Sequence, residues 1–406
     1  MKRRISVVTS ARADWGLLFP VVKLLKTHPG AETSVIATNM HLSPRYGMTV
    51  EEIEADGITV DERVPMPETD TDSPLGKAVA AAACLEGMAQ AFERLRPDIV
   101  LLLGDRYEML AVASAATIMG IPIAHIAGGE ITLGAIDDNI RHALTKLSSL
   151  HFTATEAYRQ RVIQMGEHPS RVWNTGALGV YNLANEQLLS RQELEASIGI
   201  GLNRQTLLVT FHPATRDSHP VSERCGALLD ALDRFPDSKI IFTYPNNDAD
   251  GKVIIDMIRQ YASSQPERCV VIPSLGRIRY LSTLRHIGAV VGNSSSGLVE
   301  VPSAGIPTVD IGIRQQGRLA PASVIHCDDD TESIAAAISF ALSREGQSMA
   351  AEVQNPYYSP DTPDIIVRAL TETPLSEMSP KQFYDFERIP LLHSFPTDGP
   401  KIKWNS

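Results

Sequence analysis

The run Ile99–Leu103 consists of five consecutive apolar residues with no polar residue among them. Side chains on a strand alternate between its two faces, so this run predicts a strand buried on both faces, as in a parallel sheet covered by helices. Gly104 and Asp105 turn out of the run, and a helical pattern follows as far as Met119. This stretch therefore predicts an α/β fold.

Strand and helix patterns alternate along most of the chain, which is typical of a doubly wound α/β protein. A loop is expected at residues 10–16, after the first strand. The expected strands are residues 1–9, 34–37, 57–60, 99–103, 122–127, 207–211, 239–243, 269–272, 289–291 and 308–311. The other expected helices are residues 17–25, 50–56, 75–96, 137–147, 155–165, 222–235, 251–262 and 277–286, and a polar helical stretch is expected between residue 176 and about residue 200.

The chain has 406 residues, which is too long for one average domain. Gly and Asn concentrate between residues 199 and 204, where we place a linker. We predict two Rossmann-like domains, residues 1–200 and 201–375, followed by a tail at 376–406. The simplest architecture is a GT-B-like glycosyltransferase arrangement, in which the two domains face each other across a cleft. Ligands of such domains bind beyond the carboxyl ends of the strands.

Composition excludes several classes of protein. The formal charge of −11 argues against a nucleic-acid surface, which needs concentrated Lys and Arg. The four cysteines are scattered with no CxxC pair, so we expect neither a disulfide framework nor a metal. No GxGxxG follows the first strand, and no cofactor is expected. No apolar stretch approaches the roughly 18 residues that span a bilayer, so we expect a cytoplasmic protein.

The stretch from Val290 to Glu300 is predicted to be a strand, a tight turn and the start of a helix. Its two glycines allow close backbone approach to a ligand, and Ser294, Ser295 and Ser296 offer hydroxyls beside the free amides of a first helical turn. Such a turn can bind an anion. An ordinary strand-to-helix turn with a serine cap has the same composition, so this stretch alone leaves both interpretations open.

Polar residues follow the ends of other predicted strands. They are Arg12, Asp14, Asp105, Glu130 and Asp137 in the first half, and His212, Asn246, Glu300, Arg314 and Arg318 in the second. A carboxylate at the end of a buried strand is costly to ionise without partners, so the set indicates acid/base chemistry on an anionic substrate. The three arginines are suited to holding a diphosphate. Any single member could instead be a helix cap or part of a salt bridge.

Individual roles stay open at this level. Glu300 is placed to accept ribose hydroxyls, or is a solvated helix charge. His212, which precedes Pro213, could contact phosphate, carry a proton or lie in the core. Arg141 lies near the Glu130 loop, where a structural role is the better interpretation.

Several motifs, in order along the chain, resemble one known family. They are Ser10–Gly16, Gly104–Glu108, Gly128–Glu130, Asp137–Lys146, and Gly292–Gly297 with Glu300. Over residues 4–375 the chain resembles the hydrolysing UDP-N-acetylglucosamine 2-epimerases of bacterial sialic acid synthesis, and residues 382–385 are similar to capsule-type members. The resemblance implies the double Rossmann fold and a homodimer or higher homo-oligomer.

The resemblance implies that UDP-N-acetylglucosamine and water give UDP and N-acetylmannosamine. A base removes the C2 proton while UDP leaves from C1, giving 2-acetamidoglucal, and water then adds with inverted configuration at C2. At least two acid/base groups are expected, each contributing about 10²–10⁴ in rate. The predicted catalytic residues are Asp105, Asp137, Glu130 and His212. The predicted substrate-binding residues are Arg12, Asp14, Asn246, Ser294, Ser295, Ser296, Glu300, Arg314 and Arg318.

The chain departs from many relatives at Ala127, where they carry a catalytic Glu before the Gly-Gly pair. Glu130 is a candidate replacement, or has a structural role in its loop. Close relatives that act on UDP-N,N′-diacetylbacillosamine in legionaminic acid synthesis share most of the motifs, so that sugar is the alternative substrate.

Other classes of function differ at specific motifs. Non-hydrolysing epimerases carry Gly-Thr-Arg-Pro-Glu and Gly-Asp-Thr in place of the first two motifs. A retaining transferase would require an acceptor pocket. A nucleotide-sugar sensor without chemistry would keep the Ser294 turn and Glu300 but would need neither Asp105 nor Asp137.

Overall fold

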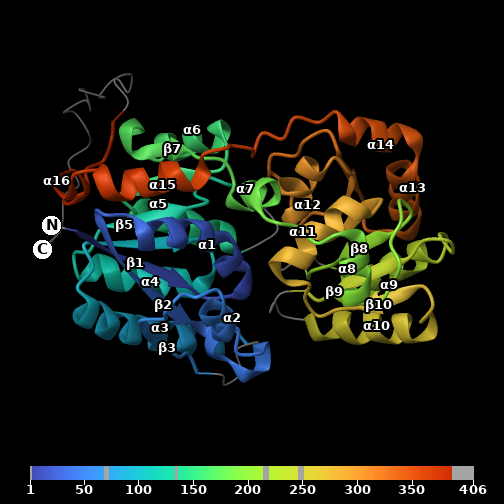
Figure 1. Ribbon diagram of the computed structural model, residues 1–406, viewed down its shortest axis with the longest axis horizontal. Helices are drawn as coiled ribbons and strands as arrows, with labels where there is room; N and C mark the ends of the chain where they lie inside the picture. The colour runs from blue at the N-terminus through green and yellow to red at the C-terminus, as the bar shows by residue number, and fades with distance from the viewer. Residues whose placement is uncertain (1, 68–72, 133–135, 214–218, 246–250, 386–406) are drawn as a thin grey trace, which may run out of the picture.

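Two parallel sheets, each covered by helices on both faces, form two domains that lie side by side (Figure 1). The computed structural model describes residues 2–67, 73–132, 136–213, 219–245 and 251–385. Within these ranges the first sheet has seven strands in the order β3-β2-β1-β4-β5-β6-β7, and the second has six in the order β10-β9-β8-β11-β12-β13. Both are the doubly wound order. The predicted fold class is confirmed.

The first domain is built from β1 to β7 and α1 to α7. The strands are Arg3–Thr9, Ala31–Thr38, Glu62–Val64, Ile99–Leu103, Ile123–Ile126, Leu150–Thr153 and Val172–Asn174. The helices are Arg12–Thr27, Val50–Ala55, Pro74–Leu95, Tyr107–Ile118, Asp137–Leu147, Glu156–Gln164 and Leu178–Asn185.

The second domain is built from β8 to β13 and α8 to α14. The strands are Leu207–Thr210, Ile240–Thr243, Cys269–Val271, Ala289–Gly292, Thr308–Ile311 and Val324–Cys327. The helices are Arg191–Ile198, Val221–Leu232, Gly251–Ser264, Gly276–His286, Ser296–Val299, Thr331–Leu342 and Arg344–Ala351. The last two helices in the described part of the chain are α15 (Thr362–Glu372) and α16 (Leu375–Met378).

The strand β4 is buried on both faces, as its sequence predicts. Ile99, Leu101 and Leu103 pack into the core on one face of the sheet. Val100 and Leu102 pack into the core on the opposite face. Hydrophobic burial from both sides therefore fixes the strand that ends at Asp105 at the centre of the first domain.

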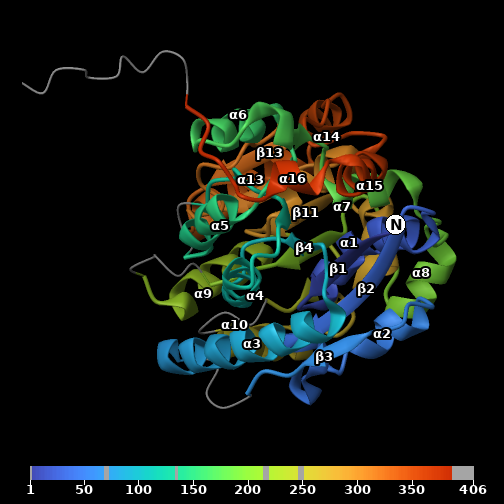
Figure 2. The same cartoon turned by 90° about the vertical axis from the view of Figure 1, so that its left-hand side faces the viewer.

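The chain passes between the domains twice. Helix α8 precedes the predicted linker, yet its Leu194 and Ile198 pack into the core of the second domain. Helix α15 returns to the first domain, where Ile366 and Leu370 join the core. In Figure 2 α15 lies beside the N-terminus, and Arg3 Nη1 donates to the Leu370 carbonyl oxygen at 2.5 Å. The predicted domain limits at residues 200 and 375 assign α8 to the first domain and α15 to the second, whereas each of these helices packs into the other domain.

Some local predictions are wrong. Residues 10–16 are not all loop, because α1 begins at Arg12 and so takes Asp14 into its first turn, where the helix dipole favours a carboxylate. The strand expected at 57–60 lies instead at Glu62–Val64. The chain reaches the sheet edge only at Asp61, whose backbone N–H and carboxylate both bond the backbone of Val35. Strands β6, β7 and β13 and helices α13 to α15 were not predicted as such.

No helix in the described ranges is long and apolar enough to cross a membrane.

Candidate active site

The order of strands in each sheet reverses next to a central strand, and this places two loops together. In the first sheet the reversal lies between β1 and β4, which pair with Ile5 opposite Ile99. In the second it lies between β8 and β11. Ligands of doubly wound sheets bind in the crevice at such points. Asp14 and Asp105 follow the first pair of strands, and His212 and the Ser294 turn follow the second.

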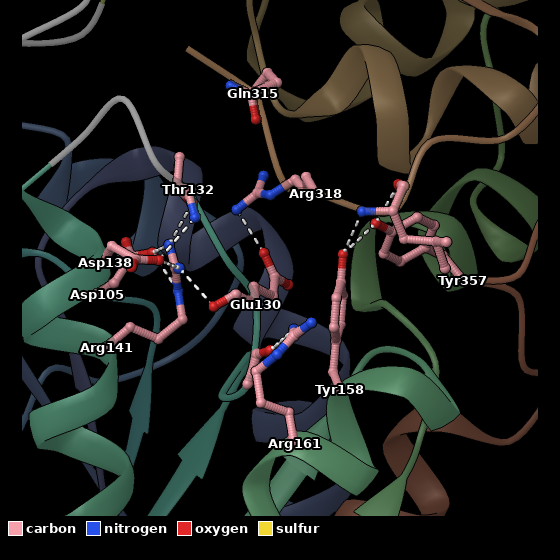
Figure 3. A network of polar contacts seen from close by, with 12 residues as sticks. Asp105, Glu130, Thr132, Asp138, Arg141, Tyr158, Arg161, Gln315, Arg318 and Tyr357 are labelled. Carbon is pink, nitrogen blue, oxygen red and sulfur yellow. Dashed lines mark hydrogen bonds and ion pairs between the residues drawn. The ribbon is translucent and has the colours of Figure 1, made fainter. Parts of the chain in front are cut away.

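The two crevices meet at a set of contacts between the domains (Figure 3). Arg318 Nη2, from the segment after β12, lies 2.5 Å from Glu130 Oε2, from the loop after β5. Next to it, the backbone N–H of Leu319 donates to Tyr158 Oη at 2.9 Å. Tyr158 Oη also lies 2.8 Å from Tyr357 Oη. The carboxyl ends of the two sheets therefore face each other across a shared polar cleft.

Asp105 is held in place by Arg141, a buried residue of α5. Arg141 Nε donates to Asp105 Oδ2 at 2.9 Å, and Nη2 binds the same oxygen. Burial opposes ionisation of Asp105, but the attraction and hydrogen bonds of Arg141, together with the smaller effects of Arg318 and His125, outweigh it, so the pKa of Asp105 lies below its usual value. Asp105 is therefore an ionised carboxylate at neutral pH. About a quarter of its side chain (24%) remains exposed to the cleft.

Asp14 lies in the first turn of α1, next to Asp105, and has the opposite electrostatic character. Burial raises the pKa of Asp14 to about 6, against the attraction of Arg106 and the hydrogen bond from Ser10 Oγ at 2.7 Å. The charges of Glu108 and Asp105 raise it further. Two carboxyl groups whose pKa values are moved apart suit the base and acid roles of one reaction.

The raised pKa of Asp14 predicts a pH effect on stability. A carboxyl whose pKa is higher in the folded state stabilises the protein below the unfolded pKa and loses that contribution as pH rises through about 6. We expect Asp14→Asn to be more stable than wild type at pH 7.5, by roughly 1–2 kcal/mol, with the difference shrinking by pH 5. Urea unfolding at the two pH values measures this. An equal difference at both pH values would contradict the assignment.

The loop that carries Glu130 has an unusual backbone. Ala127 has a φ of 70°, in the left-handed region that residues with a side chain rarely adopt. Gly129 has a φ of 81°, and a Cβ there would lie 2.5 Å from the Tyr158 carbonyl oxygen. Arg161 Nη1 binds the Gly129 carbonyl oxygen. Strain of this kind is common at functional sites. The Glu130 carboxylate is engaged by Arg318, and its catalytic role stays a prediction.

On the other side of the cleft, Asn293 joins the loops of the second domain. Its side chain accepts from the His212 backbone N–H at 2.7 Å and donates to the His212 carbonyl oxygen at 2.8 Å. Its own carbonyl oxygen accepts from Arg314 Nη1 at 2.9 Å and Gln315 Nε2 at 2.8 Å. Burial, then the charge of Arg314, lowers the pKa of His212 well below its usual value, so this imidazole is neutral.

The predicted anion turn has the expected strand, but its helix is short. Gly292 has a φ of 139°, and a Cβ there would lie 1.9 Å from the Thr210 carbonyl oxygen, so only glycine fits. Helix α12 covers Ser296–Val299 and gives way to a 3₁₀ turn at Val301–Ala304. Ser294 and Ser295 precede it and are partly exposed. The turn therefore places serine hydroxyls and backbone groups close to the cleft, but so short a helix contributes only a small dipole.

Glu300 lies at the domain interface, pressed against Gly179 of α7. A Cβ on Gly179 would lie 2.0 Å from Glu300 Oε1. Burial raises the pKa of Glu300, against a hydrogen bond from Ser296. Three buried atoms of this side of the cleft have no hydrogen-bond partner in the described part of the chain: Glu300 Oε2, Gln315 Oε1 and Arg318 Nε.

The other predicted site residues are Arg12, Asp137 and Asn246. Arg12 opens α1 and contacts Glu52 of α2, at 3.4 Å between Nη1 and Oε1. Asp137 is the first residue of α5 and is partly exposed. Asn246 lies outside the described residues. In the ranges that are described, no group of three or more His, Cys, Asp or Glu is placed to hold a metal ion.

Residues that the motifs did not single out complete the site. The sequence favours a structural role for Arg141, whereas in the structure it binds Asp105 directly. Its spacing of three residues from Asp138, which puts both on one helical face, is the sequence signal that points toward the cleft. Asn293 lies within the Gly292–Gly297 motif, although no role was assigned to it. Gly179 and Gln315 have no comparable signal, since their importance depends on contacts between distant segments.

The fold and the cleft define a class: a GT-B-like protein with carboxylates from one Rossmann-like domain facing polar loops of the other. A family model described as UDP-N-acetylglucosamine 2-epimerase matches residues 23–371. The chain belongs to the UDP-N-acetylglucosamine 2-epimerase family.

Two curated relatives and one solved structure illustrate this membership. A GDP/UDP-N,N′-diacetylbacillosamine 2-epimerase (hydrolyzing) of Campylobacter jejuni is 38% identical over 325 residues, covering 80% of this chain and 84% of that protein. The polysialic acid biosynthesis protein P7 of Escherichia coli is 34% identical over 389 residues, covering 96% and 98%. The UDP-GlcNAc 2-epimerase of Neisseria meningitidis, solved with UDP-GlcNAc bound, is similar in fold, with a TM-score of 0.76 at 18% identity over 91% of this chain and 100% of that one.

Proposed function

We propose that the protein is a hydrolysing UDP-sugar 2-epimerase that converts UDP-N-acetylglucosamine and water to UDP and N-acetylmannosamine. The observation that carries this is the set of three buried, unpartnered atoms opposite Asp105: Glu300 Oε2, Gln315 Oε1 and Arg318 Nε. A buried polar atom without a partner costs about 1–3 kcal/mol, so these atoms are expected to meet a ligand. They require one anionic group and two donors.

A UDP-sugar supplies those groups. Its diphosphate pairs with the Arg318 guanidinium, ribose hydroxyls donate to the Glu300 carboxylate, and the uracil N–H is a donor of the kind that Gln315 Oε1 accepts. The sugar then lies toward Asp14 and Asp105. Removal of the C2 proton and departure of UDP from C1 leave a C1–C2 double bond. Water then supplies a hydroxyl to C1 and a proton to C2 on the opposite face.

The paired carboxylates favour an enzyme over a nucleotide-sugar sensor. A sensor needs the nucleotide loops but has no use for Asp105, whose ionisation Arg141 maintains at the floor of the cleft. The hydrolysing class is supported by the names of two relatives, those of Campylobacter jejuni and Legionella pneumophila. The first name gives GDP/UDP-N,N′-diacetylbacillosamine and the second gives UDP-N,N′-diacetylbacillosamine, which makes the UDP form of that sugar the second candidate for this protein.

Incubation with UDP-N-acetylglucosamine in D₂O tests the proposal. We expect free N-acetylmannosamine carrying deuterium at C2, together with released UDP, as seen by NMR. UDP-N-acetylmannosamine as product would overturn the hydrolysing class. Turnover of UDP-N,N′-diacetylbacillosamine alone, in a parallel reaction, would overturn the choice of sugar.

A further inference from the structure

Arg141 is almost completely buried, with 1% of its side chain exposed, and every N–H of its guanidinium has an acceptor. Nε donates to Asp105 Oδ2, and Nη2 donates to the same oxygen and to Thr132 Oγ1 at 2.9 Å. Nη1 donates to the Glu130 carbonyl oxygen at 3.0 Å and to Asp138 Oδ1 at 3.1 Å. A guanidinium has five N–H donors. None is left for a substrate, in contrast to Arg318.

These contacts make Arg141 the common support of three segments. Asp105 follows β4, Glu130 and Thr132 belong to the loop after β5, and Asp138 lies in the first turn of α5. Asp138 Oδ1 in turn accepts from the Thr132 backbone N–H at 2.7 Å. A buried cation that bridges several segments in this way fixes their relative positions, because a shift of any one would leave a buried N–H group of the guanidinium without its acceptor.

The support of Asp105 is one-sided. Both hydrogen bonds from Arg141 end on Oδ2, and no other hydrogen bond to the Asp105 side chain occurs among the described residues. Oδ1 is therefore the oxygen that can accept a proton from a molecule in the cleft. Figure 3 shows Arg141 and Asp105 side by side on the first domain, with Arg318 reaching toward them from the second.

We infer that Arg141 is a positioning residue that fixes Asp105 by Oδ2 and presents Oδ1 as the base for the C2 proton of the sugar. The inference rests on the proposed function. Oδ1 takes the proton, the electron pair of the C2–H bond forms the C1–C2 double bond, and the C1–O bond breaks with its pair going to UDP. Arg141 itself touches neither the sugar nor UDP.

The pH profile of kcat/KM separates this role from a merely structural one. Arg141→Met removes the cation but leaves Asp105 buried, so Asp105 holds its proton to higher pH. We expect the acid limb of the profile to move up by at least about one pH unit, and turnover at pH 7 to fall by about 10²-fold or more with partial recovery at pH 9. Arg141→Lys keeps the charge with three donors in place of five. We expect its acid limb to stay near that of wild type and its kcat to fall by about tenfold.

A matched control lies at the amino ends of the second sheet. Arg268 is a partly buried arginine that also donates to backbone carbonyl oxygens, those of Ser238 and Leu232, far from the strand ends that form the cleft. Arg268→Met is expected to lower stability while leaving kcat and the acid limb unchanged. UDP affinity, measured by calorimetry, is expected to stay within about threefold of wild type in both Arg141 variants.

Three outcomes would overturn the inference. In the first, Arg141→Met loses activity equally at all pH values with an unmoved acid limb. In the second, Arg141→Lys matches wild type in both kcat and pH profile, a result that decides the matter even when Arg141→Met does not fold. In the third, the variants lose UDP affinity in proportion to turnover. A wild-type protein that turns over neither UDP-sugar would instead overturn the proposed function.

Discussion

Asp105→Asn is expected to lose about 10²–10⁴ in kcat while UDP affinity stays within about threefold of wild type. The amide has nearly the shape of the carboxylate, and its oxygen still accepts from Arg141, so the loop after β4 keeps its position. The amide is not a base at neutral pH, so it does not take the C2 proton. Release of UDP measured over time gives kcat, and calorimetry with UDP gives affinity.

The same strand provides the control for this change. Asp98 lies at the opposite end of β4, where it pairs with Arg4 at 2.7 Å on the surface. Asp98→Asn removes an exposed ion pair worth about 0.2–1 kcal/mol and leaves the cleft untouched, so wild-type kcat is expected. Parallel loss of UDP binding and turnover in Asp105→Asn would instead mean that Asp105 is a structural residue.

The fold was predictable because strands that are buried on both faces can be recognised in the sequence. Val100 and Leu102 face one core and Leu101 the other, and a short apolar run with no polar interruption is typical of a strand covered on both faces. Strand β6 was missed because its His151 looks polar, whereas in the structure it is buried and bonded to Glu167 at 3.0 Å. A strand with a buried polar side chain is recognised only once the distant partner is known.

The return of α15 to the first domain could not be predicted for a related reason. Ile366 and Leu370 form an ordinary apolar stripe on a helix. Such a stripe indicates that one face of the helix is buried, but it does not indicate which domain covers that face. The partner is decided by the path of the chain between Ala351 and Thr362, which has little regular structure.

The sequence predicted the site residues of each domain separately, without the contacts between the domains. Strand-end loops supplied Asp105, Glu130 and Arg318 because the carboxyl ends of parallel strands share one edge of a sheet. The pairing of Glu130 with Arg318 across the cleft was not predictable from either motif. It bears on the prediction that Glu130 replaces the acid/base group absent at Ala127, since the contact from Arg318 is to Oε2 and such a role would fall to the other carboxylate oxygen, Oε1.

The contact between Gly179 and Glu300 is also invisible in the sequence, and it predicts a second large effect. A Cβ at position 179 would lie 2.0 Å from Glu300 Oε1 and 2.7 Å from its carboxyl carbon. No two such atoms approach so closely, so Gly179→Ala must displace the carboxylate that we propose accepts the ribose hydroxyls. We expect UDP affinity to fall by about 10–100-fold, the loss of one or two hydrogen bonds to a charged group. Calorimetry with UDP measures it.

Gly201→Ala is the matched control, because a Cβ there meets no atom within 4 Å and the backbone conformation suits alanine. Wild-type UDP affinity is expected for it. A double-mutant cycle with Glu300→Ala then isolates the contact: once the Glu300 side chain is gone, adding a methyl group at position 179 has nothing to displace. The double variant should therefore bind UDP as weakly as Glu300→Ala alone. Additive losses would mean that Gly179 acts through the packing of α7, and that the close approach of the two domains serves some purpose other than placing this carboxylate.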